Sequence, residues 1–325
     1  MQIKTSATLT FQTKQIAAGG FGKVFMVTNV QDQSVAAVKT QSCGKNKKGV
    51  SELLWEVYVM AAFGASRHCP RLIGYMENES MDMIVMELLG PTIRDIEAKL
   101  NWKPMPPGYA ALIGRQCLSA VRDLHECYFI HRDIKPENFA FGMGDKCRRI
   151  YLIDFGMTKR YRLNDGRLLP QRRGNGFRGT ILYASERAHR REELGAADDL
   201  MSLFYVIVEM FAGKLPWYQE SDVIKVQQMK ADYTLSELTA SVGDQMKQFA
   251  NYVTSLRWNE YYRLLNFGNW IAFRYDVRPD YWKLDKLLKL IMIEHGVQLA
   301  TNISWDQLLD EKDDINNKKK QAAHK

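Results

Sequence analysis

The chain has 325 residues, a formal net charge of +8 and 46% hydrophobic residues, so it is long and apolar enough to bury a proper core. Its longest apolar stretch, residues 200–213, contains Glu209 and is too short to cross a bilayer. A buried helix is expected there, and a membrane span is excluded. The first residues lack the apolar core of a secretory signal. The positive charge indicates acidic partners without identifying nucleic acid.

The cysteines are odd in number and lack the paired spacing of metal ligands, which predicts free thiols in a reducing compartment. They are Cys43, Cys69, Cys117, Cys127 and Cys147.

The first element is a strand, glycine turn and strand over residues 16–24, which read IAAGGFGKV. Backbone amides can approach a phosphate at such a turn because glycine has no Cβ. Taken alone, the motif fits a plain hairpin turn equally well. An apolar run that ends at Lys39 follows, with the lysine seventeen residues after Gly22.

A helix is expected over residues 51–60, where Glu52 and Glu56 stand four apart and share one face. Either carboxylate could pair with Lys39, and an exposed helix charge is the plain alternative for each. An apolar strand from Ile84 follows and stops at Gly90 and Pro91.

Residues 131–138 read HRDIKPEN, and Asp154-Phe155-Gly156 begins sixteen positions after Asn138. The residues between predict two short strands, 139–141 and 150–153, joined by a loop. Such a hairpin would bring Asn138 and Asp154 side by side as two metal ligands. Together the segments supply a proton-accepting carboxylate, an amide oxygen, a lysine and a second carboxylate, which is the equipment of phosphoryl transfer.

In this order the motifs resemble those of a eukaryotic protein kinase. The resemblance implies an α+β, bilobal protein-kinase fold. A small antiparallel-sheet lobe with one main helix would occupy residues 1–87, and a larger, mainly helical lobe residues 88–309. This single kinase domain, about residues 10–309, would be followed by a charged, solvated tail over 310–325.

The resemblance also assigns roles. Asp133 would be the catalytic base, Lys135 would neutralise the transferring phosphate, and Asn138 and Asp154 would bind Mg²⁺. Lys39 would hold the phosphates of ATP, with Glu56 as the preferred ion-pair partner and Glu52 in reserve. Met86 would guard the back of the adenine pocket, and the backbone of Glu87 and Leu89 would bond the adenine. The remaining nucleotide-binding residues would be Ile16, Gly19, Gly22, Val24 and Ala37.

Within the kinases, residues 177–205, 213–217 and 86–91 resemble the casein kinase 1 group, and in it the tau-tubulin kinases. Three places depart from that pattern: Leu182 stands for an arginine, Glu186-Arg187 for Ile-Asn after Ser185, and Met201 for a tryptophan. Asp199 keeps the family's role of anchoring the catalytic-loop backbone. Ala17 stands where the kinase glycine loop usually has its first glycine.

The segment between Lys159 and Gly179 contains no serine or threonine, and Tyr161 is its one hydroxyl. It carries seven cations against Asp165, which suggests a phosphate site that includes Arg172, Arg173 and Arg178. Casein kinase 1 relatives likewise favour acidic or already phosphorylated proteins. Activity is therefore expected without phosphorylation of this segment.

These motifs predict a serine/threonine kinase that transfers the γ-phosphate of Mg-ATP to such proteins. Two alternatives stay open, a pseudokinase scaffold, which Ala17 favours, and a phosphopeptide-binding protein. A cytoplasmic monomer with no membrane or nucleic-acid partner is expected. Residues 318–320, all lysine, leave a nuclear location open.

Overall fold

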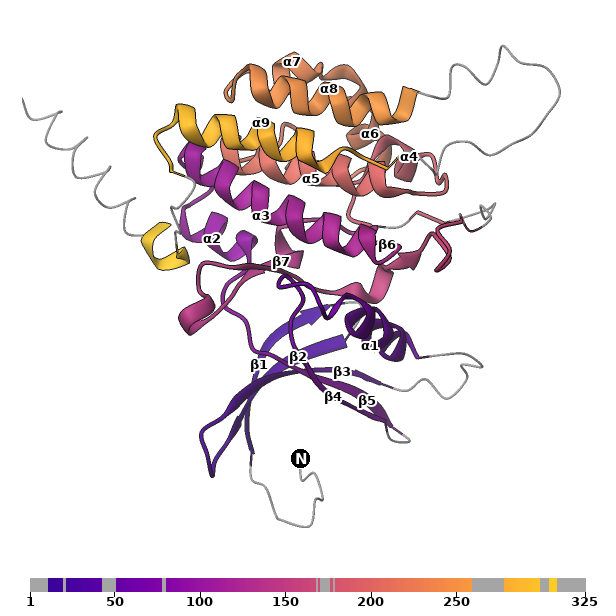
Figure 1. Ribbon diagram of the computed structural model, residues 1–325, viewed down its shortest axis with the longest axis vertical. Coiled ribbons are helices and arrows are strands. Elements are labelled where there is room, and N and C mark those ends of the chain that lie inside the picture. Colours follow the sequence, from indigo (N-terminus) through magenta and orange to yellow (C-terminus); the bar gives the residue numbers. More distant parts are fainter. Residues whose placement is uncertain are drawn as a thin grey trace, which may run out of the picture.

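In the computed structural model of the chain, the described residues are 11–19, 22–42, 51–77, 80–167, 169, 176–177, 179–258, 278–298 and 304–308. A small lobe built on a β-sheet lies at one end and a larger, mainly helical lobe at the other (Figure 1). The predicted α+β, bilobal architecture is confirmed. The predicted tail lies outside the described residues.

The small lobe is a five-stranded antiparallel sheet in the order β1-β2-β3-β5-β4. One helix, α1, packs against it and buries Leu53, Glu56, Val59, Met60 and Phe63. That three-and-four spacing is one helix face, so the sequence of α1 dictates the side that it turns inward. The elements are β1 (Phe11–Gly19), β2 (Gly22–Asn29), β3 (Val35–Ser42), α1 (Glu52–Phe63), β4 (Leu72–Glu77) and β5 (Met81–Met86).

The large lobe is organised around α3 and α5, which pack against each other. Its helices are α2 (Ile93–Lys99), α3 (Pro107–Glu126), α4 (Glu186–His189), α5 (Ala196–Ala212), α6 (Val223–Asp232), α7 (Leu235–Leu238), α8 (Asp244–Trp258) and α9 (Tyr281–Glu294). Its strands are β6 (Phe129–Ile130), β7 (Phe139–Phe141), β8 (Ile150–Leu152) and β9 (Lys159–Arg160). Single 3₁₀ turns are η1 (Pro136–Asn138), η2 (Gly144–Lys146) and η3 (Phe155–Met157).

The predicted buried helix is α5, which is apolar on nearly all sides and accordingly buried on nearly all sides. Its one internal acid, Glu209, accepts hydrogen bonds from Tyr183 and Arg94. No helix in the described ranges is long and apolar enough to span a membrane. Cys69, Cys117, Cys127 and Cys147 are free thiols, as predicted, and Cys43 lies outside the described residues.

A half-buried lysine fastens the loop before α4 to α6. Lys230 Nζ donates to the carbonyl oxygens of Ile181 and Ala184, each at 2.8 Å, and lies 3.3 Å from His189 Nε2. Burial, with the charge of Lys230, lowers the pKa of His189 to about 4. The folded protein therefore keeps this imidazole neutral at a pH where the unfolded chain protonates it.

The free energy of unfolding should consequently fall as the pH decreases from about 6.5 towards 4, because His189 then binds a proton in the unfolded state but not in the folded state. Between pH 7.5 and 5 the loss from His189 should be about 2 kcal/mol. Urea unfolding of wild type and His189→Gln at both pH values measures it. Other histidines add slopes common to both proteins, so the difference isolates His189. Identical pH slopes would contradict the prediction.

Candidate active site

The sheet register places the expected nucleotide-binding side chains on one face. Val24 lies opposite Lys39 across β2 and β3, and Ala37 lies opposite Met86 across β3 and β5. Because side chains two apart on a strand share a face, these four residues line the same side of the sheet. Lys39 contacts α1 on that side. The predicted adenine wall is thus a single surface.

The predicted glycine turn joins β1 and β2, with Gly19 opposite Gly22. Gly22 has φ +120°, and a Cβ there would lie 2.0 Å from the carbonyl oxygen of Thr40, so no side chain fits. Gly19 is sterically open, with nothing within 4 Å of such a Cβ. The strand pairing skips Ile16, whose side chain is 48% exposed beside the turn.

Ala17 lies in β1 opposite Val24, and its φ is not positive, so this position does not demand glycine. Ala17→Gly should leave kcat within about a factor of two and lower KM for ATP modestly, because glycine adds freedom without relieving any strain. Steady-state kinetics with varied ATP measures both constants. A large rise in kcat would mean that Ala17 suppresses catalysis.

Lys39 joins two carboxylates from different lobes. Its Nζ lies 2.8 Å from Glu56 Oε2 and 2.8 Å from Asp154 Oδ1. Burial alone would lower the pKa of Lys39, but these two charges outweigh it and raise that pKa. Burial would raise the pKa of Asp154, and the charge of Lys39 overcomes it and lowers that pKa. Lys39 and Asp154 are therefore charged near neutral pH. Burial raises the pKa of Glu56, against the opposing charge of Lys39. The two ion pairs fix Lys39 between Glu56 and Asp154.

The structure decides between the two candidate glutamates. Glu56 is buried, pairs with Lys39 and accepts the backbone N–H of Phe155 at 3.0 Å. Glu52 is exposed and accepts from Gln41 instead. Trp55 on the same helix donates to the carbonyl oxygen of Thr158 at 2.8 Å. These bonds hold α1 in place against the segment that carries Asp154.

At the predicted hinge, the backbone N–H and the carboxylate of Glu87 both form hydrogen bonds within the protein. Its N–H donates to Arg71 O at 2.9 Å, and its carboxylate accepts from Lys146 Nζ at 2.6 Å. The Glu87 carbonyl and the backbone of Leu89 are then the groups left for an adenine edge. The next residue, Gly90, donates its N–H to Phe141 O at 2.8 Å, which ties the hinge to β7.

The predicted base, Asp133, is buried, and two neighbouring side chains orient its carboxylate. Lys135 Nζ donates to Asp133 Oδ2 at 2.7 Å, and Thr180 Oγ1 donates to Oδ1 at 2.8 Å. Lys135 Nζ also lies 3.2 Å from Thr180 Oγ1. Thr180 is a site residue that the sequence reasoning missed. Its signal was the Gly-Thr pair inside the casein kinase 1-like segment, to which no role was given.

The backbone before Asp133 is strained and held by Asp199. Arg132 has φ +68°, which costs a side-chain-bearing residue energy. Asp199, in the first turn of α5, accepts the N–H groups of His131 at 2.6 Å and Arg132 at 2.8 Å. His125 donates to the same carboxylate at 2.8 Å and bonds Tyr281 on α9 at 2.6 Å. The anchoring contact predicted for Asp199 is present.

Asn138 and Asp154 fit a divalent cation. The β7–β8 pairing is as predicted, and Ile153 N donates to Asn138 O at 3.0 Å. Asp154 follows Ile153 directly, so Asn138 and Asp154 lie close together. Asn138 Nδ2 donates to Asp133 O at 2.8 Å, which points its amide oxygen away from that contact. A carboxylate and an amide oxygen suit Mg²⁺, which usually takes few protein ligands and completes its shell with phosphate and water.

The segment after Asp154 corrects the idea of an anion site made from all its cations. Lys159 Nζ pairs with Glu193 at 2.5 Å, Arg162 donates to Gly166 O at 2.8 Å, and Arg167 pairs with Asp165 at 2.7 Å. These three side chains are already bonded to other groups of the same chain. Arg172, Arg173 and Arg178 lie outside the described residues.

Of the departures from the casein kinase 1 pattern, Leu182 is half-buried against the core and its carbonyl oxygen accepts from Trp217 Nε1 at 2.9 Å. Met201 is buried in α5, and Arg187 lies near Asp198 and donates to Glu193 O. All three thus serve the scaffold.

A two-lobed fold with a lysine–glutamate pair, a catalytic aspartate loop and a metal-binding hairpin defines a protein kinase site. The protein kinase domain family matches residues 11–264 of the chain, and the chain belongs to that family. Such domains use ATP and a divalent metal and act on proteins.

Two relatives add detail. A probable serine/threonine-protein kinase of Dictyostelium discoideum is 32% identical over 294 residues, covering 90% of this chain and 55% of the relative. A putative casein kinase I of Caenorhabditis elegans is 30% identical over 237 residues, covering 73% of this chain and 69% of that protein. The chain thus spans about half the length of the first relative.

Proposed function

We propose that this protein is a serine/threonine protein kinase that transfers the γ-phosphate of Mg-ATP to acidic or already phosphorylated proteins. The observation that carries the proposal is Asp133, buried and held between Lys135 and Thr180, together with the complete Lys39–Glu56 pair, which Asp154 joins. Lys135, two residues after the base, supports serine or threonine as the acceptor. The name of the Dictyostelium discoideum relative agrees with that choice.

In the proposed reaction Asp133 Oδ2 accepts the proton of the substrate hydroxyl as the hydroxyl oxygen attacks the γ-phosphorus, and the bond from that phosphorus to the bridging oxygen of ATP breaks, which releases ADP. Lys135 Nζ, 2.7 Å from that oxygen, is placed to neutralise charge on the transferred group. Lys39, fixed by Glu56, orients the nucleotide phosphates. Mg²⁺, held by Asn138 and Asp154, would screen the negative charge of the phosphates.

A pseudokinase scaffold is the alternative function. A scaffold has no need of a buried lysine–glutamate pair together with an oriented base and two metal ligands. All of these groups are present, and Ala17 occupies a position that tolerates it. A phosphopeptide-binding role is compatible with catalysis, and its candidate residues Arg172, Arg173 and Arg178 lie outside the described residues.

The finer assignment, a casein kinase 1-type enzyme related to the tau-tubulin kinases, is supported by the segment 177–217 and by the name of the Caenorhabditis elegans relative. We also propose a monomer in the cytoplasm, with a nuclear location open.

Activity should not require phosphorylation of the segment 159–179. It contains no serine or threonine, and the Tyr161 hydroxyl is buried and donates to His125 O at 3.2 Å. Protein made in bacteria should therefore transfer radiolabelled phosphate from ATP to casein and to acidic or phosphorylated peptides without an upstream kinase. If it transfers nothing while binding ATP, the pseudokinase alternative is favoured. Equal kcat/KM for acidic and basic peptides would refute the substrate class alone.

A further inference from the structure

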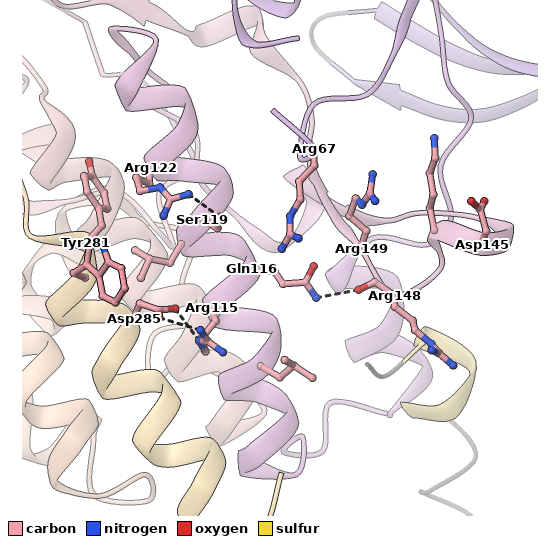
Figure 2. A pocket seen from close by; sticks show the side chains of 14 residues that line it. Arg67, Arg115, Gln116, Ser119, Arg122, Asp145, Arg148, Arg149, Tyr281 and Asp285 are labelled. Carbon is pink, nitrogen blue, oxygen red and sulfur yellow. Dashed lines mark hydrogen bonds and ion pairs between the residues drawn. The ribbon is translucent and has the colours of Figure 1, made fainter. Parts of the chain in front are cut away.

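A pocket of about 600 Å³ lies on the large lobe, lined by none of the nucleotide or catalytic residues described above. The exposed face of α3 runs through it, with Tyr281 and Asp285 of α9 on one side and Arg67, Arg148 and Arg149 on the other (Figure 2). The cations that line it are Arg67, Arg115, Arg122, Lys146, Arg148 and Arg149.

Half of these cations are neutralised and build the walls. Arg115 bonds both carboxylate oxygens of Asp285, at 2.7 and 2.9 Å, and so fastens α3 to α9. Arg122 pairs with Asp123 at 2.8 Å. Lys146 pairs with Glu87. Because these three cations are already paired with carboxylates, they contribute to the walls of the pocket and add little to its net positive charge.

The other three, Arg67, Arg148 and Arg149, have no acidic partner among the described residues. Arg67 Nε donates to His68 Nε2 at 3.3 Å, and His68 Nδ1 in turn donates to Ile150 O at 2.7 Å. Burial, with Arg67 and Arg149 nearby, lowers the pKa of His68, so its ring stays neutral. The neutral His68 ring therefore holds Arg67 at the pocket but does not neutralise its positive charge.

The turn before β8, which carries the other two arginines, is equally fixed. Gln116 on α3 donates from Nε2 to Arg148 O at 3.0 Å and accepts the N–H of Ile150 at 3.1 Å. The guanidinium of Arg149 lies 6.0 Å from the ring centre of Tyr151. Three arginines on hydrogen-bonded backbone therefore line one pocket, and their guanidinium groups suit carboxylates, which guanidinium bonds in pairs.

Trp282 at the edge of this pocket is 82% exposed. A large exposed aromatic ring across the pocket from cations without an acidic partner offers an apolar contact and a charged contact to one extended ligand. A small inorganic anion would use only the cations. Asp145 also lines the pocket and would repel an unbroken polyphosphate chain, so a peptide with spaced charges fits better than nucleic acid.

We propose that this pocket docks an acidic segment of a protein substrate, with its carboxylates on Arg67, Arg148 and Arg149 and an apolar side chain against Trp282. The proposal rests on the proposed kinase function, because docking matters for an enzyme whose substrates are proteins. Binding at a second place raises the local concentration of the target hydroxyl, which lowers KM and leaves the chemical step unchanged.

The binding experiment uses fluorescence anisotropy of a labelled, glutamate-rich peptide with a central leucine and the full chain. The triple variant Arg67→Gln/Arg148→Gln/Arg149→Gln should raise Kd at least roughly tenfold, the effect of losing one charge-assisted bond. The control Lys14→Gln/Lys103→Gln/Lys247→Gln removes equal charge from exposed positions outside the pocket and should change Kd less than about twofold. Trp282→Ala should also weaken binding, and added salt should weaken it further.

The kinetic experiment compares a short serine peptide with the same peptide joined to the acidic segment by a flexible linker of about 30 residues, which spans on the order of 30 Å. The joined peptide should have the lower KM, and the Arg67, Arg148 and Arg149 triple variant should abolish that advantage without changing kcat or the KM of the short peptide.

Several results would overturn the docking proposal: equal Kd for the triple variant and wild type, equal binding of a glutamine-for-glutamate peptide, or tighter binding of an RNA of matched charge. These outcomes are separate from a failure of the kinase function. If wild type phosphorylates nothing, the anisotropy experiment still tests the pocket, and if it phosphorylates both peptides with one KM, only the docking proposal fails.

Discussion

Asp133→Asn should lower kcat by about 10²- to 10⁴-fold, the usual contribution of a positioned general base. The amide cannot accept the substrate proton, and its NH₂ group would face a donor, either Lys135 or Thr180, that now bonds a carboxylate oxygen. KM for ATP should change little, because Lys39 and Glu56 hold the nucleotide from the other lobe. Steady-state transfer of radiolabelled phosphate to casein measures both constants.

Two companion variants sharpen this experiment. Asp154→Asn removes a proposed metal ligand and should abolish Mg²⁺-dependent transfer. Asp165→Asn removes a carboxylate from the same segment, but one that is exposed and pairs with Arg167, so kcat should stay within about twofold. If Asp133→Asn, Asp154→Asn and wild type transfer phosphate equally, the assigned mechanism is wrong. Retained folding is checked by thermal unfolding.

The parts of this protein that the sequence predicts well are those in which spacing along the chain determines geometry. The burial of Glu56 fits the spacing of Leu53, Val59 and Met60 on the same face of α1, whereas the preference for Glu56 over Glu52 came from the resemblance to other kinases. The β7–β8 hairpin likewise follows from two apolar runs around a short loop. In both cases neighbours within about ten residues decide the outcome.

The features that the sequence did not predict depend on residues far apart in the chain. Thr180 reaches Asp133 from 47 positions away, and Arg115 pairs with Asp285 across 170. Counting charges between Lys159 and Gly179 suggested an anion site, yet Lys159 is satisfied by Glu193, 34 residues later. The number of charged residues in a segment does not show which of them form ion pairs. Only the tertiary structure distinguishes the paired charges from the unpaired ones.

The same long-range logic gives the second large effect, which concerns Asp199. Burial would raise the pKa of this carboxyl, but the hydrogen bond and charge of His125, together with His131, lower it, so Asp199 is anionic in the folded protein. Its two oxygens accept the backbone N–H groups of His131 and Arg132 and so hold the strained backbone that leads to Asp133.

Asp199→Asn should therefore lower kcat by roughly 10²-fold and destabilise the protein by about 1–3 kcal/mol. An asparagine offers one acceptor oxygen, so at least one of the two buried N–H groups loses its partner, and Arg132 can relax from its positive φ. KM for ATP should be nearly unchanged, since Asp199 touches no expected nucleotide-binding residue. Transfer kinetics and urea unfolding measure these effects separately.

Tyr281→Phe is the matched control, because it removes the far end of the same chain of hydrogen bonds, the hydroxyl that bonds His125, and leaves Asp199 intact. It should cost about 1 kcal/mol of stability and alter kcat by no more than about threefold. A folded Asp199→Asn variant with kcat as high as that of Tyr281→Phe would show that the catalytic loop keeps its geometry without the carboxylate. If instead only Asp199→Asn loses kcat, the two backbone hydrogen bonds are what position Asp133.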